Sequence, residues 1–406
     1  MMERLGLGDA WSKVPRPMRH GLLPAVVALL LVLYPSYYSD LTSLIGTNST
    51  ESQLIPTVPT MVIMTVYVVM ALGLNVVVGY AGLLDLGYVA FYAAGAYVAG
   101  WFATQQFTPH DVHLASVGVP HSVQGIHINV WFLLLVGAVF AALFGIVIGL
   151  PTLRLRGDYL AIVTLGFGEI VPQAVNNGDN WFGHNITNGP NGLTPIDALG
   201  FGSLHNQWAF LPSVYYSVTN ATSYYYWTGL ALVAFTLFCC IRIRDSRLGR
   251  AWVAIREDEI AAAAMGVPLM RTKTLAYAIG AFFGGMAGCF YAIYKSSTFP
   301  GDFSLNISIT VLCMVILGGM GNVWGVCLGG AVLSYLNYQG LEAVGNNFNN
   351  IAGTSFNVPQ YTYGIFGLII VVMMLLRPQG LIPGQRRKVE LELGVEGGSM
   401  YEASAQ

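Results

Sequence analysis

The sequence predicts an all-α, polytopic membrane protein with about ten transmembrane helices and both ends of the chain on the cytoplasmic side. Three observations support this fold class. Of the 406 residues, 55% are hydrophobic and only 9% are charged, whereas soluble domains carry about 25% charged residues. Apolar stretches of about 20 residues, the length that crosses a bilayer, recur along the chain. The basic residues gather in alternate loops, as they do when such loops stay in the cytoplasm.

The predicted spans are poor in charge, and most match the thickness of a bilayer. The first is short, and the border between the eighth and the ninth is weakly marked because residues 306–343 are apolar almost throughout. The short alternating segments of β-barrel strands are not seen. We place the spans at residues 22–38, 59–80, 83–107, 128–150, 158–176, 223–241, 274–294, 306–324, 325–343 and 359–376.

The distribution of basic residues tests this number of spans independently. With ten spans, all of the 18 Lys and Arg residues except Lys295 fall on the cytoplasmic side. The predicted outer loops 39–58, 108–127 and 177–222 contain no Lys or Arg. A wrong number of spans before residue 240 would scatter the charges over both faces. We therefore expect a multi-pass protein of the cell (inner or plasma) membrane.

The chain reads as one transmembrane domain, residues 1–376, followed by a polar and acidic cytoplasmic tail, residues 377–406, which we expect to be disordered. Two glycine-rich stretches, Gly79–Gly82 and Gly318–Gly321, lie near predicted inner turns. Each precedes a span rich in small residues. This likeness is compatible with an internal duplication of the kind found in transporters, but it does not decide for one.

The sequence contains no catalytic, metal-binding or phosphate-binding motif. A P-loop is absent, so we expect neither ATP bound in that manner nor a cofactor or metal in this chain. The five cysteines lie in apolar spans without C-x-x-C spacing and are interpreted as packing residues. His110, His113, His121 and His127 share one outer loop, which we expect to be solvated rather than to hold a metal ion.

Polar residues in or beside the spans are candidates for the transport path, because burying them unpaired is expensive. Glu169 lies deep in the fifth span and either lines the path or bonds to a neighbouring helix. Asp158 and Asp85 lie near the inner ends of the fifth and third spans, where each is expected to cap its helix. Asn75 lies in the second span.

The cytoplasmic loop 242–273 combines many charges with an Ala-rich segment. Alanine favours helix, and Gly266 and Pro268 are helix stop signals, so a short helix of about two turns is expected there. Such a helix is either a docking surface for another protein or a simple linker.

Five blocks of this sequence together resemble LivM-type permeases, the membrane subunits of branched-chain amino acid ABC importers. The blocks occur in the same order as in that family. They are Leu74–Tyr92, Arg154–Ile170, Gly189–Gly192, Arg250–Gly266 and Leu317–Gly321.

The resemblance implies a complex with a second, related permease, two cytoplasmic ATPase subunits and an external substrate-binding protein, surrounded by membrane lipid and without nucleic acid. The Ala-rich loop matches the motif that docks on the ATPases. The importer motif has Glu-Ala-Ala six residues before its Gly, but Ile260 occupies that position here and Glu259 stands seven away. By position, the residues at the ATPase contact are Arg256, Glu257, Asp258, Glu259, Ala262 and Gly266.

These features predict a permease that exposes its path alternately to each side, driven by ATP hydrolysis in partner subunits. A path lined by small and apolar residues suits a branched-chain amino acid. A permease for urea or short amides is an alternative within the same class, and a stand-alone secondary transporter or channel is an alternative from another. A membrane enzyme is disfavoured because no catalytic constellation exists.

Overall fold

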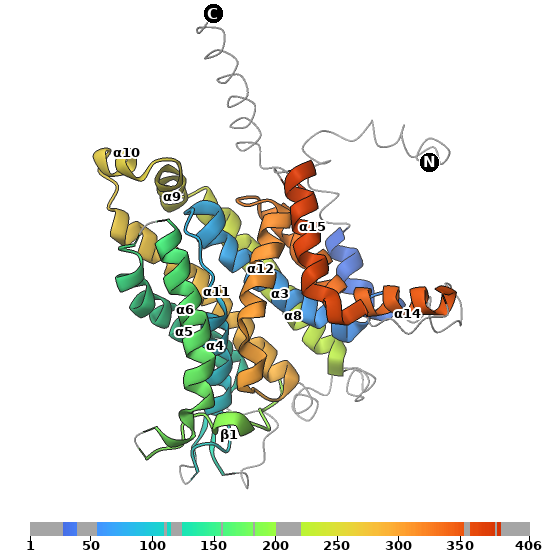
Figure 1. Ribbon diagram of the computed structural model, residues 1–406. Helices are drawn as coiled ribbons and strands as arrows, with labels where there is room; N and C mark the ends of the chain where they lie inside the picture. The colour runs from blue at the N-terminus through green and yellow to red at the C-terminus, as the bar shows by residue number, and fades with distance from the viewer. Residues whose placement is uncertain are drawn as a thin grey trace, which may run out of the picture.

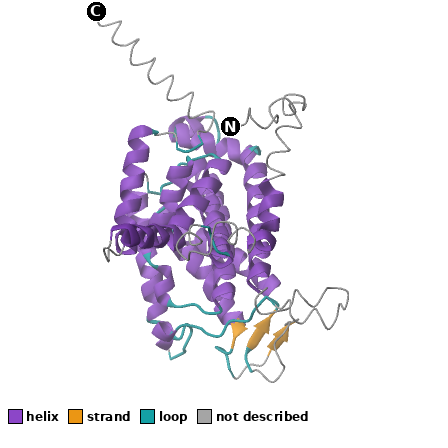
Figure 2. Cartoon of the chain, turned by 90° about the vertical axis from the view of Figure 1, so that its right-hand side faces the viewer, coloured by secondary structure: helices purple, strands orange, loops and turns teal. Residues whose placement is uncertain are grey.

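The computed structural model consists of helices that run between the two ends of one bundle (Figures 1 and 2). A small sheet lies at one end, here called the sheet end. The short helices α9 and α10 lie at the other, here called the α10 end. The structure describes residues 27–38, 55–108, 112–114, 124–155, 157–181, 183–199, 221–352, 358–377 and 380–382.

Each predicted span overlaps a helix in the described residues. The long elements are the helix Val27–Tyr38, α3 (Val58–Leu74) with its π-helical continuation η3 (Asn75–Tyr80), α4 (Val89–Phe102), α5 (Val130–Thr152), α6 (Asp158–Asn176), α8 (Ala221–Arg244), α11 (Leu269–Lys295), α12 (Leu305–Gly318), α13 (Val323–Tyr335) and α15 (Thr362–Leu376). The shorter elements are η4 (Gly178–Asn180), η5 (Gly189–Asn191), α9 (Arg247–Glu257), α10 (Glu259–Ala264), η8 (Pro300–Phe303), η9 (Leu336–Gly340), α14 (Leu341–Ala352) and η10 (Val358–Tyr361).

Within the described ranges, five helices are long and apolar enough to cross a membrane. They are Val58–Tyr80, Val130–Thr152, Thr222–Arg244, Leu269–Lys295 and Pro300–Gly318. The full number of ten spans stays a prediction, as does the cytoplasmic position of both termini. Most of the tail 377–406 lies outside the described residues.

The helix borders follow ordinary end signals. Thr57 and Asn129 cap α3 and α5 by accepting a bond from a backbone N–H of the first turn. The predicted border between the eighth and ninth spans, at 324/325, was a few residues too late. The helix α12 ends at Gly318, and Asn322 caps α13 through Trp324 N (3.2 Å).

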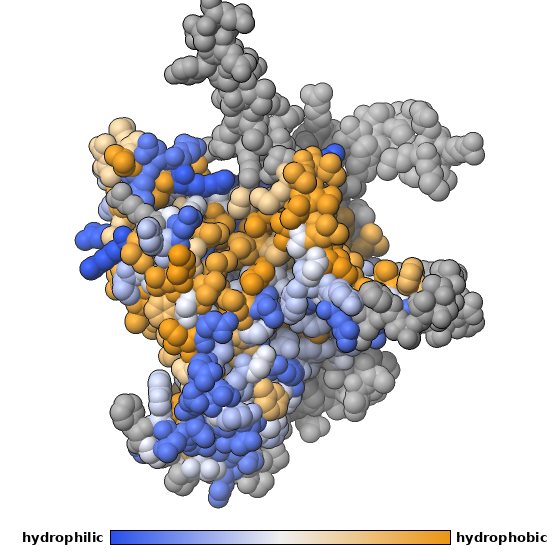
Figure 3. Space-filling view, viewed as in Figure 1, coloured by the Kyte–Doolittle hydropathy of each residue, from blue (hydrophilic) through white to orange (hydrophobic). Residues whose placement is uncertain are grey.

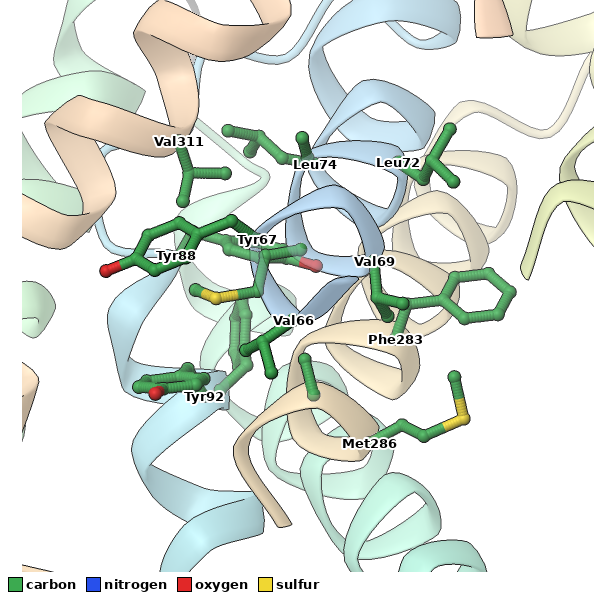
Figure 4. Close-up of a cluster of buried hydrophobic side chains, with 14 of the residues drawn as sticks. Val66, Tyr67, Val69, Leu72, Leu74, Tyr88, Tyr92, Phe283, Met286 and Val311 are labelled. Atoms are coloured by element: carbon green, nitrogen blue, oxygen red, sulfur yellow. The ribbon is translucent and has the colours of Figure 1, made fainter. Parts of the chain in front are cut away.

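Small residues let the central helices approach closely. The helix α11 packs against α3, α4 and α5. A Cβ atom at Gly95 of α4 would lie 1.9 Å from Gly285 O of α11, and one at Gly288 would lie 1.9 Å from Tyr92 O. Figure 4 shows the adjoining core, where Tyr67 and Val69 of α3 lie near Tyr88, the residue before α4, and Phe283 of α11. This glycine-based packing is typical of membrane helices.

The third predicted span is only partly helical. Residues 81–88 are not helical, and α4 begins at Val89, whose N–H donates to Ser308 Oγ of α12 (2.9 Å). At 1.5 Å per residue, the 14 residues of α4 measure about 21 Å, less than a bilayer core of ~30 Å. Non-helical backbone is tolerated at membrane depth only when protein or a water-filled cavity surrounds it. Most of this non-helical segment, residues 81–88, which we call the α4 entry, is buried, including Leu83, Asp85, Gly87 and Tyr88.

A three-stranded sheet, which the sequence did not indicate, closes the sheet end. Its strands are β1 (Ala103–Thr104), β2 (Val112–Leu114) and β3 (Ile126–Ile128), in the order β1-β3-β2. The strand β3 pairs antiparallel with β1 and parallel with β2.

The face of the bundle seen in Figure 3 is largely apolar in its middle part, as contact with lipid requires. The helix α5, for example, exposes a row of large apolar side chains: Phe132, Leu135, Val139, Leu143 and Val147. In the same view, hydrophilic residues cover the lower part of the face, over the sheet end of α6 and the loops beneath it.

Candidate functional site

The loop 242–273 folds into two short helices rather than the one that was predicted. Ser246 caps α9, and Asp258 caps α10 by accepting bonds from Ile260 N (2.8 Å) and Ala261 N (3.0 Å). Trp252 is fully buried, and its Nε1 donates to Thr272 O (2.8 Å). The loop is therefore a fixed structure attached to the start of α11.

The acidic residues of this loop have different roles. Glu259 pairs with Lys273 of α11 at 2.7 Å, and the Lys273 side chain is only 5% exposed. Asp258 serves as the helix cap, whereas Glu257 is exposed. Glu259 is thus engaged inside the chain, whereas Glu257 and Asp258 are both exposed, Asp258 as the cap of α10.

The surface that α10 presents is small and apolar. Ile260 is 73% exposed and Met265 is 85% exposed, whereas Ala262 is buried. Gly266 ends the helix with φ +86° and is exposed. Exposed large apolar side chains on a fixed, short helix outside the bundle form a compact patch that a protein partner could cover.

Arg256 links the loop to the transmembrane helices. Its Nη1 donates to Gly79 O in η3 (2.6 Å), and its Cγ lies over Gly82, where a Cβ atom would come within 2.7 Å. A cation at the carbonyl end of a helix is favourable because the exposed carbonyls carry partial negative charge. Gly82 has φ +69°, a conformation that favours glycine.

The two glycine stretches singled out in the sequence meet at this point. Asn75 Oδ1 accepts a bond from Gly321 N (2.8 Å). A Cβ atom at Gly79 would lie 2.0 Å from that same Oδ1. We name Asn75, Gly79, Gly82, Arg256 and Gly321 the glycine junction. It ties α9, η3 and the α12–α13 turn together at the α10 end, so a movement of the loop would act directly on both turns.

The two predicted aspartate caps are not formed as expected. The N-cap of α6 is Gly157, and Asp158 is exposed in the first turn, where its charge still favours the helix N-terminus. The N-cap of α4 is Tyr88, and it makes no side-chain capping bond. Asp85 instead accepts from Gly87 N (2.9 Å) and is fully buried in the non-helical entry.

Glu169 lies on the outside of α6. It is exposed and lines a groove of about 520 Å³ together with Gln173, Asn177 and Trp181. The polar residues recur every four positions and therefore lie on one face of the helix. No bond to a neighbouring helix is found for Glu169 among the described residues. An ionisable group at membrane depth rarely faces lipid, so this face requires protein or water beside it.

Two histidines of the predicted outer loop, His113 and His127, lie in the small sheet. His127 is 2% exposed, stacks on His113 (ring centroids 5.1 Å apart) and bonds through Nδ1 to Asp197 Oδ2 at 2.7 Å. Burial raises the pKa of Asp197, although the hydrogen bond with His127 opposes this shift. The solvated-loop prediction is wrong for His127, and His110 and His121 lie outside the described residues. Within the described part of the chain, no group of three metal-ligating side chains exists.

Sequence reasoning missed Trp252 and Lys273, the two anchors of the loop. A lone tryptophan in a charged segment was the available signal for the first. Nothing in the sequence pattern pairs Lys273 with Glu259.

Comparisons with known proteins cover most of the chain. A family model described as "Branched-chain amino acid transport system / permease component" matches residues 57–374. The permease protein LivM of the high-affinity branched-chain amino acid transport system of Escherichia coli K12 is 36% identical over 343 residues, covering 82% of this chain and 71% of the relative. Its Salmonella typhimurium counterpart is 37% identical over 339 residues, covering 81% and 70%.

The permease protein LivH of the same E. coli system is also similar, with 26% identity over 155 residues, 38% of this chain and 44% of the relative. No solved structure matches the chain. The family match extends over most of the sequence and includes the α9–α10 loop and the glycine junction. This chain belongs to the family of branched-chain amino acid transport system permease components.

Proposed function

We propose that this chain is the membrane-spanning permease subunit of an ATP-driven importer for branched-chain or related hydrophobic amino acids. The observation that carries the proposal is the family match over residues 57–374, together with the LivM relatives at 36% and 37% identity. The chain is a multi-pass transport subunit of the cell membrane and not an enzyme. ATP is hydrolysed by partner subunits, because the sequence has no P-loop of its own.

The α9–α10 loop, residues 242–273, docks on the ATPase subunits, of which the complex contains two. The exposed Ile260 and Met265 supply the apolar contact, and Glu257 supplies a charge at its edge. The cap by Asp258 and the pair between Glu259 and Lys273 hold the loop in shape. Arg256 then transmits its movement to the glycine junction, which supports a direct mechanical link from ATP hydrolysis to the path.

A second, related permease covers the face that carries Glu169. The similarity to LivH, a differently named permease of the E. coli system, supports a related partner. An exposed carboxylate on α6 is costly against lipid but stable when a protein partner or a water-filled path lies beside it.

The topology that fits this function has ten spans with both termini and the α10 end in the cytoplasm. The sheet end then faces outward and receives the external binding protein. The meeting of Gly79 and Gly321 at one junction supports an internal pseudo-repeat, in which corresponding inner turns of two halves lie side by side.

The experiment that tests the proposal is uptake of labelled leucine by cells that express the complete complex. Deleting the genes of the ATPase subunits should abolish uptake. Leucine bound by the cognate binding protein should be taken up, whereas urea and short amides should not. Uptake that persists without the ATPases would decide for a stand-alone transporter. Delivery of urea in place of leucine would decide for the alternative importer.

A further inference from the structure

A polar cavity of about 210 Å³ lies in the sheet half of the bundle, away from the glycine junction. Its walls come from α3, α4, α11, η8, α12, η9 and α15, segments that are far apart in the sequence. Tyr67, near the middle of the continuous helix Val58–Tyr80, marks its inner limit. Asp302 of η8, next to the end of α11, marks its outer limit.

The lining of this cavity is unusual for a membrane bundle. Five tyrosines contribute to it: Tyr67, Tyr92, Tyr291, Tyr338 and Tyr363. Tyr67 and Tyr92 are buried, and the hydroxyl groups of Tyr67 and Tyr338 lie 2.9 Å apart, in hydrogen-bond contact. Tyr363 is 57% exposed, so the cavity reaches the surface at α15. Polar groups in an apolar bundle are expensive to keep and commonly mark a substrate pathway.

A charged pair stands at the outer limit. Asp302 Oδ1 accepts from Lys295 Nζ at 2.5 Å, and Asp302 Oδ2 accepts from Phe299 N at 3.1 Å. Lys295 is also 6.0 Å from the ring centroid of Tyr291. Of this pair only Asp302 lines the cavity, and its carboxylate is complementary to the ammonium group of an amino acid. The polar groups of Ser304, Asn306 and Thr310 in the same lining can donate hydrogen bonds to the carboxylate of that amino acid.

The rest of the lining suits the remainder of an amino acid. Tyrosine offers a hydroxyl group as donor or acceptor and a ring face as an apolar contact. The hydroxyl groups of Tyr67 and Tyr338 can exchange their mutual bond for bonds to a ligand. The aromatic faces of Tyr92 and Tyr291, whose centroids lie 5.8 Å apart, give contact area to an aliphatic side chain.

We infer that this tyrosine cavity is a transit site in the permease for a small zwitterionic amino acid with an apolar side chain. The inference rests on the proposed function and adds to it. The permease contributes its own contacts to the substrate, so selection is not left entirely to the external binding protein. The cavity receives the amino acid at Asp302 and passes it toward Tyr67.

The test uses the complete complex in proteoliposomes, with leucine uptake and ATP hydrolysis measured together. The variants Tyr67→Phe and Tyr338→Phe each remove one hydroxyl group and keep the ring. Tyr363→Phe is a third variant at an exposed position, where folding is not at risk. The matched control is Tyr226→Phe, whose hydroxyl group donates to Leu31 O (2.8 Å) outside the cavity.

The cavity variants should keep ATP hydrolysis stimulated by leucine-loaded binding protein, while leucine uptake per ATP falls about fivefold, the effect of losing one neutral hydrogen bond. The control should keep both. Uptake per ATP equal to that of Tyr226→Phe in all three variants would overturn the inference. A wild-type complex that takes up leucine without ATP would contradict the proposed function instead, and the uptake rates of the variants would still decide whether the cavity is used.

Discussion

Removing the Arg256 guanidinium should uncouple ATP hydrolysis from transport. Arg256 Nη1 donates to Gly79 O over 2.6 Å, and this contact joins α9 to the end of η3. Hydrogen bonds that involve a charged group are worth about 1.5–3 kcal/mol. Because the Arg256 residue is exposed overall, we take the lower value, about 1.5 kcal/mol, which corresponds to about a tenfold weaker attachment.

The assay compares leucine uptake with ATP hydrolysis in proteoliposomes that contain the complete complex. In Arg256→Ala, assembly with the ATPase subunits should persist while uptake per ATP falls by up to about tenfold. The matched control is Arg250→Ala in the same helix, because Arg250 Nη1 donates to Asp245 O of the adjoining turn (3.1 Å) and not to η3. Equal coupling in the two variants would refute the mechanical role of the glycine junction.

Three further changes have defined outcomes. Lys273→Met removes the buried ammonium group that pairs with Glu259 and should lower the melting temperature of the purified permease by several degrees, whereas Glu257→Gln should leave it unchanged; equal melting curves would contradict the pair's role. Gly95→Ala places a Cβ atom 1.9 Å from Gly285 O and should prevent recovery of folded protein from detergent. In the control Gly166→Ala the new Cβ atom meets nothing within 4 Å, so its size-exclusion profile should equal that of the wild type. Asp197→Asn weakens the bond to buried His127 and should speed proteolysis of the sheet end in right-side-out vesicles; unchanged cleavage would show that the pair does not hold this end.

The positions of the helices were predictable because lipid imposes a simple rule on the sequence. The predicted fifth span, 158–176, coincides with α6, and the predicted spans at 59–80 and 128–150 differ from the observed helices by two residues or fewer at each end. Length and apolarity are sufficient there, since every backbone group in lipid must be bonded within the helix.

The non-helical entry to α4 could not be read in the same way. Apolar residues continue through 83–107, so composition alone predicts a full span. The break depends on tertiary contacts, in which Leu86 N donates to Thr164 Oγ1 (3.1 Å) and Val89 N to Ser308 Oγ (2.9 Å). Gly82, Asp85 and Gly87 were the local signals, and they have meaning only once α6 and α12 are in place.

The candidate site was predicted in location but not in detail. The loop 242–273 and both glycine stretches were recognised in the sequence. Their meeting was not, because the bond from Arg256 to Gly79 spans 177 positions of the chain. Hydrogen bonds and ion pairs at such separations leave no periodic trace in a single sequence, and the same holds for the tyrosine cavity.

The central claim is that the exposed end of α10 faces the cytoplasm and is covered by the ATPase subunits. The most direct measurement is labelling of Met265→Cys, at a position that is 85% exposed, with a membrane-impermeant thiol reagent after the native cysteines have been replaced. The account predicts labelling only in inside-out vesicles, and protection of that cysteine when the ATPase subunits are bound. Labelling from the outside, or equal labelling with and without the ATPases, would contradict it.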